Sequence, residues 1–476
     1  MLLSSTEIQH SGIQFGTSGA RGLVTQFTAN ACAAFTHAFI HCMKQQFQFS
    51  QVAIAIDNRP SSPAMAQACI KALEQCGIEA IYYGVVPTPA LAYVSMQDKM
   101  PCIMVTGSHI PFDRNGLKFY RPDGEISKAD ELAILNAQAQ FDSVIALSEP
   151  VVNNKAAIDY VARYTSLFDS SLLRGKRVGI YEHSSAGRDL YADMFKRLGA
   201  DVIALERSNE FVPIDTEAVS DEDKRKAKKW SAEYQLDFIF STDGDGDRPL
   251  VSDEEGEWLR GDVLGLICAN AMNIEALAVP VSCNTAIEKS QAFKYVERTK
   301  VGSPYVIAEF DTLANDYASV AGFEANGGFL LGTDASVNNQ MIKALPTRDA
   351  VLPALMLLSA AKETTISALV NALPKRVTHS DRIQNFATAK SLQILANGKD
   401  SPQAFLNQLA FTDALIDSVD TTDGLRITFT CGDIVHFRPS GNAPELRCYA
   451  ESESIEQARY LVNHALKNIQ LMAVDL

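Results

Sequence analysis

The sequence lacks an apolar run close to the roughly 18 residues that a membrane-spanning helix needs. Its first residues, MLLSSTEIQHSG, contain neither a basic stretch nor a long apolar core of the kind that marks a secretory signal. We therefore expect a cytoplasmic protein without a membrane partner.

Paired cysteines are also missing. The nine cysteines are odd in number, scattered along the chain, and include no C-x-x-C pair. This distribution does not fit a disulfide framework or a zinc site, so we expect buried free thiols.

Positive charge is scarce. The chain has 42 Lys and Arg against 57 Asp and Glu, a formal net charge of -15. Such a field repels polyanions, which argues against nucleic acid or an anionic membrane surface as partner. An anionic ligand would need local Arg and Lys side chains to overcome that field.

The pattern of strands and helices indicates several domains, because 476 residues are too many for one hydrophobic core. Residues 51–57 form a short apolar strand, and a helix follows in which Ser62 is expected to N-cap, Pro63 to occupy the first position and Gly77 to end it. Strand, helix and strand in this order predict a parallel sheet covered by helices.

The same alternation of strands and helices recurs twice before the pattern of the chain changes in its C-terminal part. Strand-like and helix-like segments alternate between about 177 and 370, whereas the tail has short strands joined by tight turns and one long final helix. We therefore expect three α/β domains and a C-terminal α+β domain. The predicted boundaries are 1–150, 151–261, 262–373 and 374–476.

Three aspartates lie within five positions in STDGDGDRPL (241–250), directly after an apolar strand. A polar turn would not need three alternating carboxylates. A calcium loop of EF-hand type would use Glu254 at its twelfth position, but its sixth position holds Arg248 instead of Gly. The pattern favours a Mg2+ site at the end of a sheet strand, with Gly244 and Gly246 letting the carboxylates converge.

A serine stands just past another strand in IMVTGSHIPFDRNGLKFY (103–120). Ser108 could be an ordinary turn or N-cap residue, or a nucleophilic hydroxyl with a basic group nearby to move its proton. The surrounding T-G-S-H does not match the G-x-S-x-G pattern of hydrolases.

Two further stretches are suited to anions. FGTSGARG (15–22) is a glycine-rich loop with Arg21, weak evidence by itself. In HFRPSGNAPELRCY (436–449), two guanidinium groups, a hydroxyl and exposed backbone N–H groups could surround a phosphate, although a hairpin with solvated arginines is the alternative. A phosphoryl-carrying hydroxyl, a divalent ion, a base and a distant phosphate anchor together suit an intramolecular phosphate shift.

FGTSGARG, TGSHIP with NGLKFY, DGDGDR and RPSGNAPELR occur in this order over nearly the whole chain, and in this the sequence resembles the α-D-phosphohexomutase family, which includes phosphomannomutase and phosphoglucomutase. The stretches VVPTPAL (85–91) and RTKVGSPYV (298–306) are similar to the family as well. The resemblance implies a heart-shaped protein in which three related mixed-sheet α/β domains and the α+β domain surround a central cleft.

The resemblance also implies roles for individual residues. Ser108 would be the phosphoserine, and one of its phosphoryl oxygens would bind Mg2+ together with Asp243, Asp245 and Asp247. Lys118 would transfer protons with His109 as a helper, and Arg21 and Arg248 would lie near the transferring group. The phosphate that stays in place would be bound by Arg438, Ser440, Gly441, Asn442 and Arg447.

The sequence departs from the family pattern in three loops. The serine loop has Ile110 where Asn is usual, and the phosphate loop has Asn442 in place of a hydroxyl residue. The sugar loop, usually G-E-x-S-G, reads FEANGGF and keeps Glu324 beside Asn326. Glu324 beside this polar residue could accept hydrogen bonds from the C3 and C4 hydroxyls that mannose and glucose share. The alternative is an Asn-Gly-Gly turn with a solvated Glu.

The function implied is an isomerase that interconverts mannose 6-phosphate and mannose 1-phosphate through a phosphoserine and a hexose 1,6-bisphosphate, which would also act as activator. The partners expected are small hexose phosphates, and the chain is expected to be a monomer or weak dimer. Glucose phosphates are the alternative substrates, and glucosamine phosphate a weaker one. A non-catalytic sugar-phosphate sensor and a phosphatase stay open as other classes.

Overall fold

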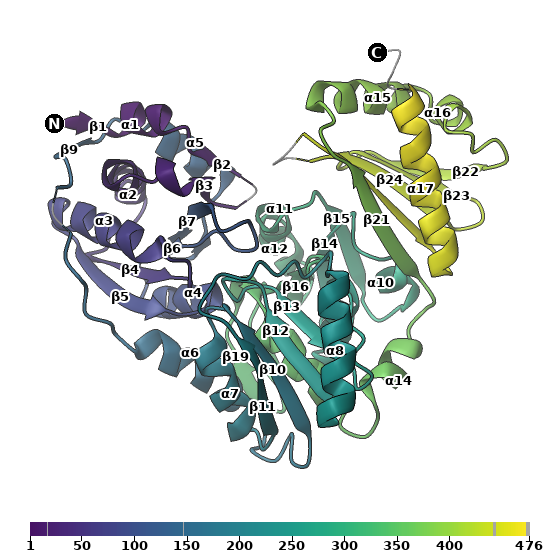
Figure 1. Ribbon diagram of the computed structural model, residues 1–476, viewed down its shortest axis with the longest axis horizontal. Coiled ribbons are helices and arrows are strands. Elements are labelled where there is room, and N and C mark those ends of the chain that lie inside the picture. Colours follow the sequence, from purple (N-terminus) through teal and green to yellow (C-terminus); the bar gives the residue numbers. More distant parts are fainter. Residues whose placement is uncertain (17, 146, 441–443, 473–476) are drawn as a thin grey trace.

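The computed structural model describes residues 1–16, 18–145, 147–440 and 444–472. Its outline is that of a heart, with the N-terminal part forming one lobe, the C-terminal part the other, and the middle of the chain the base (Figure 1). Within the described residues, none of the helices is both long and apolar enough to cross a membrane.

The first unit is built on a mixed sheet with strand order β2-β3-β7-β6-β4-β5. Its strands are β2 (Gln14–Phe15), β3 (Ala20–Leu23), β4 (Gln51–Ile56), β5 (Glu79–Val85), β6 (Cys102–Val105), β7 (Arg114–Arg121) and β8 (Gly124–Glu125), the last paired with β7. The helices are α1 (Ser4–Ser11), α2 (Ala29–Met43), α3 (Ser62–Gln75), α4 (Thr88–Gln97) and α5 (Lys128–Asn136). A short pair, β1 (Leu2–Leu3) and β9 (Gln140–Phe141), joins the two ends of this unit.

The second unit has the strand order β11-β10-β12-β13. Its strands are β10 (Arg177–His183), β11 (Asp201–Arg207), β12 (Phe238–Thr242) and β13 (Pro249–Ser252), and its helices are α6 (Lys155–Thr165), α7 (Arg188–Arg197) and α8 (Asp221–Tyr234).

The third unit has the strand order β15-β14-β16-β17-β20. Its strands are β14 (Ala276–Pro280), β15 (Tyr295–Thr299), β16 (Val320–Phe323), β17 (Phe329–Leu331) and β20 (Leu345–Asp349), with a hairpin of β18 (Ala335–Val337) and β19 (Gln340–Ile342). The helices are α9 (Gly261–Ala271), α10 (Ala286–Lys289), α11 (Ser303–Ala308), α12 (Phe310–Ala314), α13 (Val351–Ala360) and α14 (Ile366–Asn371).

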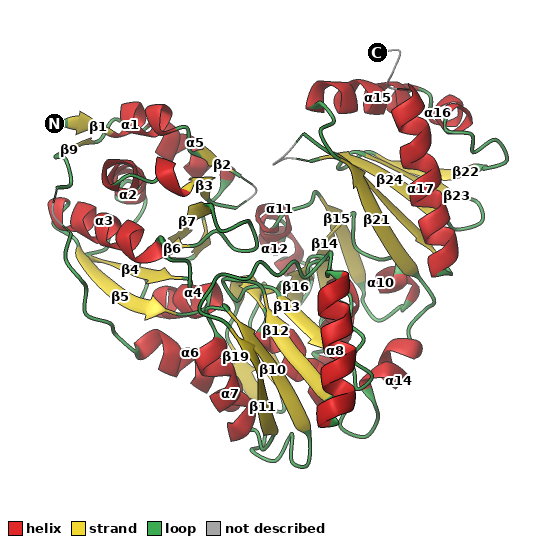
Figure 2. Cartoon of the chain, viewed as in Figure 1, coloured by secondary structure: helices red, strands yellow, loops and turns green. Residues whose placement is uncertain are grey.

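The fourth unit is an antiparallel sheet, β21-β25-β24-β23-β22, with helices on it (Figure 2). Its strands are β21 (Val377–Ile383), β22 (Ile416–Asp420), β23 (Leu425–Phe429), β24 (Ile434–Pro439) and β25 (Leu446–Ser452). Its helices are α15 (Thr388–Asp400), α16 (Pro402–Gln408) and α17 (Ile455–Met472), and α17 packs on β21 and β25. The predicted α+β character of the tail is confirmed.

The first three units share one topology, as expected. In each, a central strand pairs in parallel with two neighbours, and the next strand is antiparallel: β5-β4-β6-β7, β11-β10-β12-β13 and β15-β14-β16-β17. The loop that joins the third strand to the fourth therefore occupies an equivalent place in all three units.

Apolar packing divides the molecule differently from the sheets. Buried side chains of the first three units, including Met104, Phe240 and Phe323, form one continuous cluster. The fourth unit has a core of its own, with Phe437 and Leu461 among its members. A unit with a separate core can move as a body relative to the rest.

The start of α3 differs from the prediction. The N-cap position is Ser61, and Ser62 is already the first residue of the helix. The Ser62 hydroxyl does not cap the helix, because it donates to Asp57 Oδ1 at 2.6 Å. The same hydroxyl accepts from Asn115 Nδ2 at 3.1 Å, so it belongs to a buried side-chain network and does not accept from the free N–H groups at the helix start.

Candidate active site

The three equivalent loops of the first three units carry the residues singled out in the sequence. The loop after β6 holds Ser108, the loop after β12 holds the aspartates, and the loop after β16 holds Glu324. Parallel strands end at the same edge of a sheet, which is where such folds bind ligands. The three loops belong to different sheets, and hydrogen bonds from Ser108 to Asp243 and from Arg348 to Asp247 and Glu324 bring them together.

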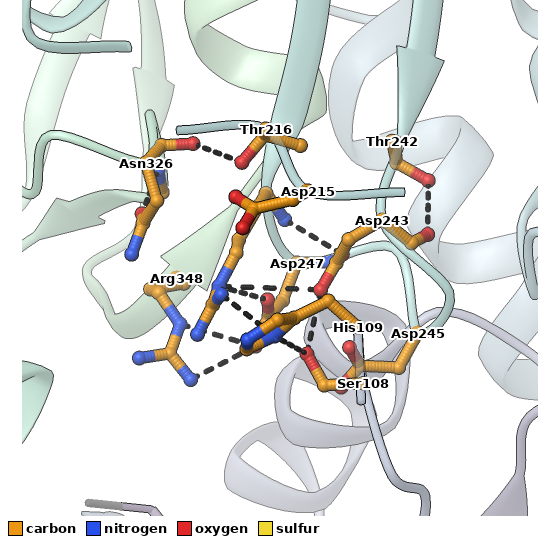
Figure 3. Close-up of polar contacts among 12 residues, drawn as sticks. Ser108, His109, Asp215, Thr216, Thr242, Asp243, Asp245, Asp247, Asn326 and Arg348 are labelled. Carbon is orange, nitrogen blue, oxygen red and sulfur yellow. Dashed lines mark hydrogen bonds and ion pairs between the residues drawn. The ribbon is translucent and has the colours of Figure 1, made fainter. Parts of the chain in front are cut away.

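Ser108 is buried and points at the aspartate loop (Figure 3). Its Oγ donates to Asp243 Oδ2 at 2.6 Å, and its backbone N–H donates to Thr106 Oγ1 at 2.8 Å. Its φ of 53° lies in the left-handed region, which non-glycine residues adopt rarely and at a cost. Strained backbone at a buried hydroxyl is typical of a nucleophile held in place by its surroundings.

The three aspartates converge as predicted. Asp243, Asp245 and Asp247 are fully buried, and one carboxylate oxygen from each lies within 4.8 Å of the others. Gly246 makes the turn with a φ of 74°, and a Cβ on Gly244 would come within 2.7 Å of the Ser108 carbonyl oxygen. The glycines therefore allow both the turn and the close approach of the two loops.

The donor set fits a divalent cation. Among the described residues, the Oδ1 atoms of Asp245 and Asp247 are buried without a hydrogen-bond partner. Buried carboxylate oxygens without partners are costly unless a cation or donor meets them, and oxygen ligands suit Mg2+. The EF-hand alternative is wrong, because Glu254 turns away from this loop to accept hydrogen bonds from Ser367.

The charges in the loop are strongly unequal. Burial, together with the neighbouring Asp245 and Asp247, raises the pKa of Asp243 well above its ordinary value. Burial also acts to raise the pKa of Asp245, but the ammonium of Lys118 outweighs it and the net shift is downward. Lys118 Nζ lies 2.5 Å from Asp245 Oδ2 and 2.8 Å from Asp247 Oδ2. Lys118 thus contacts two of the three aspartates.

Arg248 and Arg21 keep His109, the neighbour of Ser108, neutral. Arg248 Nη1 donates to His109 Nδ1 at 2.9 Å, and Ser108 Oγ lies 3.4 Å from the same nitrogen. Burial, then the charges of Arg248 and Arg21, lowers the pKa of His109 to about 2. Burial and Arg248 lower the pKa of Arg21 to about 10. The imidazole is therefore a neutral hydrogen-bonding group at physiological pH.

Arg348, which the sequence did not single out, connects the sugar loop to the aspartate loop. Arg348, in β20, places Nε 3.1 Å and Nη2 3.0 Å from Asp247 Oδ2, and Nη1 3.1 Å from Glu324 Oε2. Asn326 is held from the second unit, because Thr216 Oγ1 donates to its carbonyl oxygen at 2.7 Å. Glu324 and Asn326 are both buried, which does not fit a solvated turn.

The phosphate-loop residues form a separate group on the fourth unit. Arg438 and Arg447 stand opposite each other on β24 and β25, and Arg438 Nε pairs with Asp423 at 2.7 Å. Ser440 is buried at the end of β24. Gly441 and Asn442 lie outside the described residues. The expected phosphate loop therefore has its two guanidinium groups on adjacent strands.

A cavity of about 210 Å³ connects the fourth unit to the second. Arg447 and Tyr449 line one side of it, and Asp215 and Glu217 line the other. Asp381 and Arg382 of β21 complete the charged lining of this cavity.

Several residues at the site were missed, and only some left a signal. Thr88 binds the aspartate loop through its N–H to the Asp245 carbonyl and its Oγ1 to Asp245 Oδ2, which accounts for the family-like stretch VVPTPAL. Ser303, in the family-like stretch 298–306, accepts from Arg348 at 3.0 Å. Arg348 and Thr216 have no local pattern that marks them.

Comparison with known proteins agrees with this architecture. The chain matches the phosphoglucomutase/phosphomannomutase alpha/beta/alpha domains I, II and III at residues 12–143, 158–256 and 260–377, and the C-terminal domain at 381–467. The protein belongs to the phosphoglucomutase/phosphomannomutase family. The predicted resemblance to the α-D-phosphohexomutases is confirmed.

Relatives within this family align over nearly the whole chain. A phosphomannomutase of Salmonella muenchen is 58% identical over 463 residues, covering 97% of this chain and 97% of the relative. A phosphomannomutase of Sinorhizobium fredii is 41% identical over 467 residues, covering 96% and 98%. These relatives place the chain close to phosphomannomutases within the family.

Solved structures of the family share the fold. A phosphoglucomutase/phosphomannomutase family protein of Burkholderia thailandensis superimposes with a TM-score of 0.75 at 19% identity, covering 99% of this chain and 98% of that one. The Aspergillus fumigatus N-acetylphosphoglucosamine mutase, solved in complex with GlcNAc-6P and magnesium, gives a TM-score of 0.60 at 14% identity, covering 99% and 98%.

Proposed function

We propose that this protein is a phosphomannomutase, which interconverts mannose 6-phosphate and mannose 1-phosphate. The observation that carries the proposal is the buried Ser108 hydroxyl, 2.6 Å from the first of three clustered aspartates. The names of the relatives at 58% and 41% identity support the mannose substrate. A nucleophile beside a metal-type carboxylate cluster is not needed by a binding module, which disfavours the sensor alternative.

Asp243, Asp245 and Asp247 would hold Mg2+ together with the phosphoserine. The ion would neutralise charge on the transferring phosphoryl group. Its identity is supported by the all-oxygen donor set and by the magnesium in the Aspergillus fumigatus complex.

Proton and phosphoryl transfer would run between Ser108 and the sugar. In the forward step the phosphoserine O–P bond breaks, a bond forms from phosphorus to a sugar hydroxyl oxygen, and the sugar proton passes to the serine oxygen by way of Lys118. His109, Arg21 and Arg248 would bind the phosphoryl oxygens and orient them. The hexose 1,6-bisphosphate then turns over, and the reverse step returns the other phosphoryl group to Ser108.

Sugar recognition would involve Glu324 and Asn326, and phosphate recognition the fourth unit. Glu324 accepts hydrogen bonds, so it would bind hydroxyls that mannose and glucose share. Arg438, Ser440 and Arg447, with Gly441 and Asn442, would hold the phosphate that is not transferred. A phosphatase has no need for this second anchor.

The proposal extends to the activator, the cellular location, the oligomeric state and the domain boundaries. A hexose 1,6-bisphosphate would act as activator by restoring lost phosphoserine. We also propose a cytoplasmic location, a monomer or weak dimer, and domain boundaries near residues 150, 261 and 373.

The test compares mannose 1-phosphate and glucose 1-phosphate as substrates of the purified protein, with Mg2+ and a trace of hexose 1,6-bisphosphate. We expect faster conversion of the mannose compound and loss of both activities in Ser108→Ala. Faster conversion of glucose 1-phosphate would change the substrate assignment. Net release of inorganic phosphate would indicate a phosphatase, and sugar binding without conversion would favour the sensor.

A further inference from the structure

Arg59 is a buried arginine next to the serine loop to which the mechanism above gives no role. It follows β4, and its side chain is 1% exposed. Nη1 donates to the carbonyl oxygens of Pro111 and Arg114 at 2.8 and 2.9 Å. Nη2 donates to those of Ser108 and Ile110 at 2.9 and 2.5 Å. Three main-chain carbonyls of the serine loop and that of Arg114, the first residue of β7, thus converge on one guanidinium group.

The faces and the remaining edge of this guanidinium group are also occupied. The Phe211 ring of the second unit lies over it, 3.8 Å from Cζ to the ring centroid. A Cβ on Gly107 would come within 2.6 Å of Cζ, so the loop itself lies against the group. Nε lies 3.2 Å from Asp57 Oδ2 in an ion pair that lacks hydrogen-bond geometry. The group is therefore held in one orientation from several sides.

Asp57 connects the same arginine to the other side of Ser108. Its carboxylate accepts from Thr106 Oγ1 at 2.7 Å, and Thr106 Oγ1 accepts from the Ser108 N–H at 2.8 Å. Arg59 binds the Ser108 carbonyl. Both peptide groups that flank the serine are thereby fixed, and fixing them is what a φ of 53° requires.

We propose that Arg59 is a positioning residue, which holds the Ser108 loop in the strained conformation that aims Oγ at the phosphoryl group. The inference rests on the proposed phosphoserine mechanism. In the step affected, an Oγ–P bond forms, the O–P bond of hexose 1,6-bisphosphate breaks, and the serine proton ends on the released sugar oxygen. Arg59 touches none of the reacting atoms and acts through the backbone of the loop.

The test measures how fast Ser108 is phosphorylated by glucose 1,6-bisphosphate, followed by intact-protein mass, in wild-type protein and in Arg59→Lys. Lysine keeps the charge beside Asp57 but cannot reach four carbonyls with one ammonium group. We expect Ser108 to be phosphorylated about 100-fold more slowly in Arg59→Lys, because a small misplacement of a nucleophile lowers the rate by about this factor. We also expect full phosphorylation at long times and a kcat that falls while KM changes little.

The matched control is Arg163→Lys. Arg163 is also buried, donates to the carbonyl oxygen of Lys343 at 2.7 Å and stacks over Tyr93 at 4.6 Å. It shares the burial and the contact types of Arg59 but not the serine loop. Its variant should lose thermal stability to a similar degree and phosphorylate Ser108 at the wild-type rate.

Each outcome bears on a distinct claim. If Ser108 is phosphorylated as fast in Arg59→Lys as in the wild type, the inference about Arg59 is overturned and the proposed function still stands. Wild-type protein that takes up no phosphoryl group overturns the proposed function as well. If Arg59→Lys does not fold, Gly107→Ala displaces the guanidinium group from the loop without removing it. That variant should show the same slow phosphorylation, and a wild-type rate in it overturns the inference.

Discussion

At the scale of single residues, the site depends on arginines that connect groups from different units. Arg348 is 2% exposed and bridges an aspartate of the second unit to the sugar-loop glutamate of the third. One rigid guanidinium fork positions both carboxylates, so metal binding and sugar binding should be coupled through it.

We predict that Arg348→Lys weakens both kinds of binding. Because lysine cannot span Asp247 and Glu324, the KM for sugar phosphate and the Mg2+ concentration for half-maximal activity should each rise, by about tenfold from the loss of charged hydrogen bonds. Steady-state kinetics at varied Mg2+ measures both. Arg163→Lys, which alters a buried arginine that donates to the Lys343 carbonyl oxygen, serves as control. A rise in only one constant would show that Arg348 does not couple them.

At the scale of elements, the loop between β12 and β13 holds three buried carboxylates that its neighbouring cations, Lys118, Arg248 and Arg348, stabilise unequally. The raised pKa of Asp243 means that the ionised carboxylate is disfavoured in the folded state. This charge therefore reduces stability near neutral pH unless a cation is bound.

Asp243→Asn should consequently stabilise the metal-free protein. Removing one buried charge should raise the free energy of unfolding by about 1 kcal/mol without Mg2+. Adding Mg2+ should raise the unfolding temperature of the wild type but not of the variant. Asp237→Asn provides the control, because Asp237 pairs with Lys176 and its loss should not stabilise the protein. Thermal unfolding with and without EDTA measures all three, and a destabilised Asp243→Asn would contradict the argument.

At the scale of the whole molecule, the candidate site residues lie partly on the first three units, which share one apolar cluster, and partly on the fourth unit, which has its own core. The first three units are joined by one apolar cluster, while the fourth is attached through polar contacts such as Asn284 Nδ2 to the Arg376 carbonyl and Thr285 N to Glu451. We expect the fourth unit to close on the bound sugar, since a bisphosphate must turn while water is excluded.

The fourth unit should accordingly contribute to binding more than to chemistry. Arg447→Gln should raise the KM for mannose 1-phosphate about tenfold, the value of a lost charge-assisted hydrogen bond, with a smaller change in kcat. Phosphorylation of Ser108 and steady-state rates distinguish the two effects. The exposed Arg459 of α17 offers a charge-matched control, Arg459→Gln, which should leave KM unchanged. An unchanged KM in Arg447→Gln would remove this residue from the phosphate site.

The sequence by itself determined the chemistry and its order along the chain. Ser108 and the three aspartates could be found because nucleophiles, glycines and carboxylates stand in short patterns at strand ends, and strand ends are visible in local hydrophobicity. The four units could be separated for the same reason. Lys118 lies inside β7, and its role came from the family resemblance.

Only the tertiary structure decided which distant groups act on those residues. In the local sequence, Arg59 resembles a residue before a helix and Arg348 a strand residue. In the structure, Arg59 binds the serine loop, and Arg348 joins Asp247 to Glu324. The partner of Ser62 was also not predictable from the local sequence, because its hydroxyl binds Asp57 and not the start of the helix. Contacts between positions tens to hundreds of residues apart depend on how sheets and cores pack, and local patterns do not contain that information.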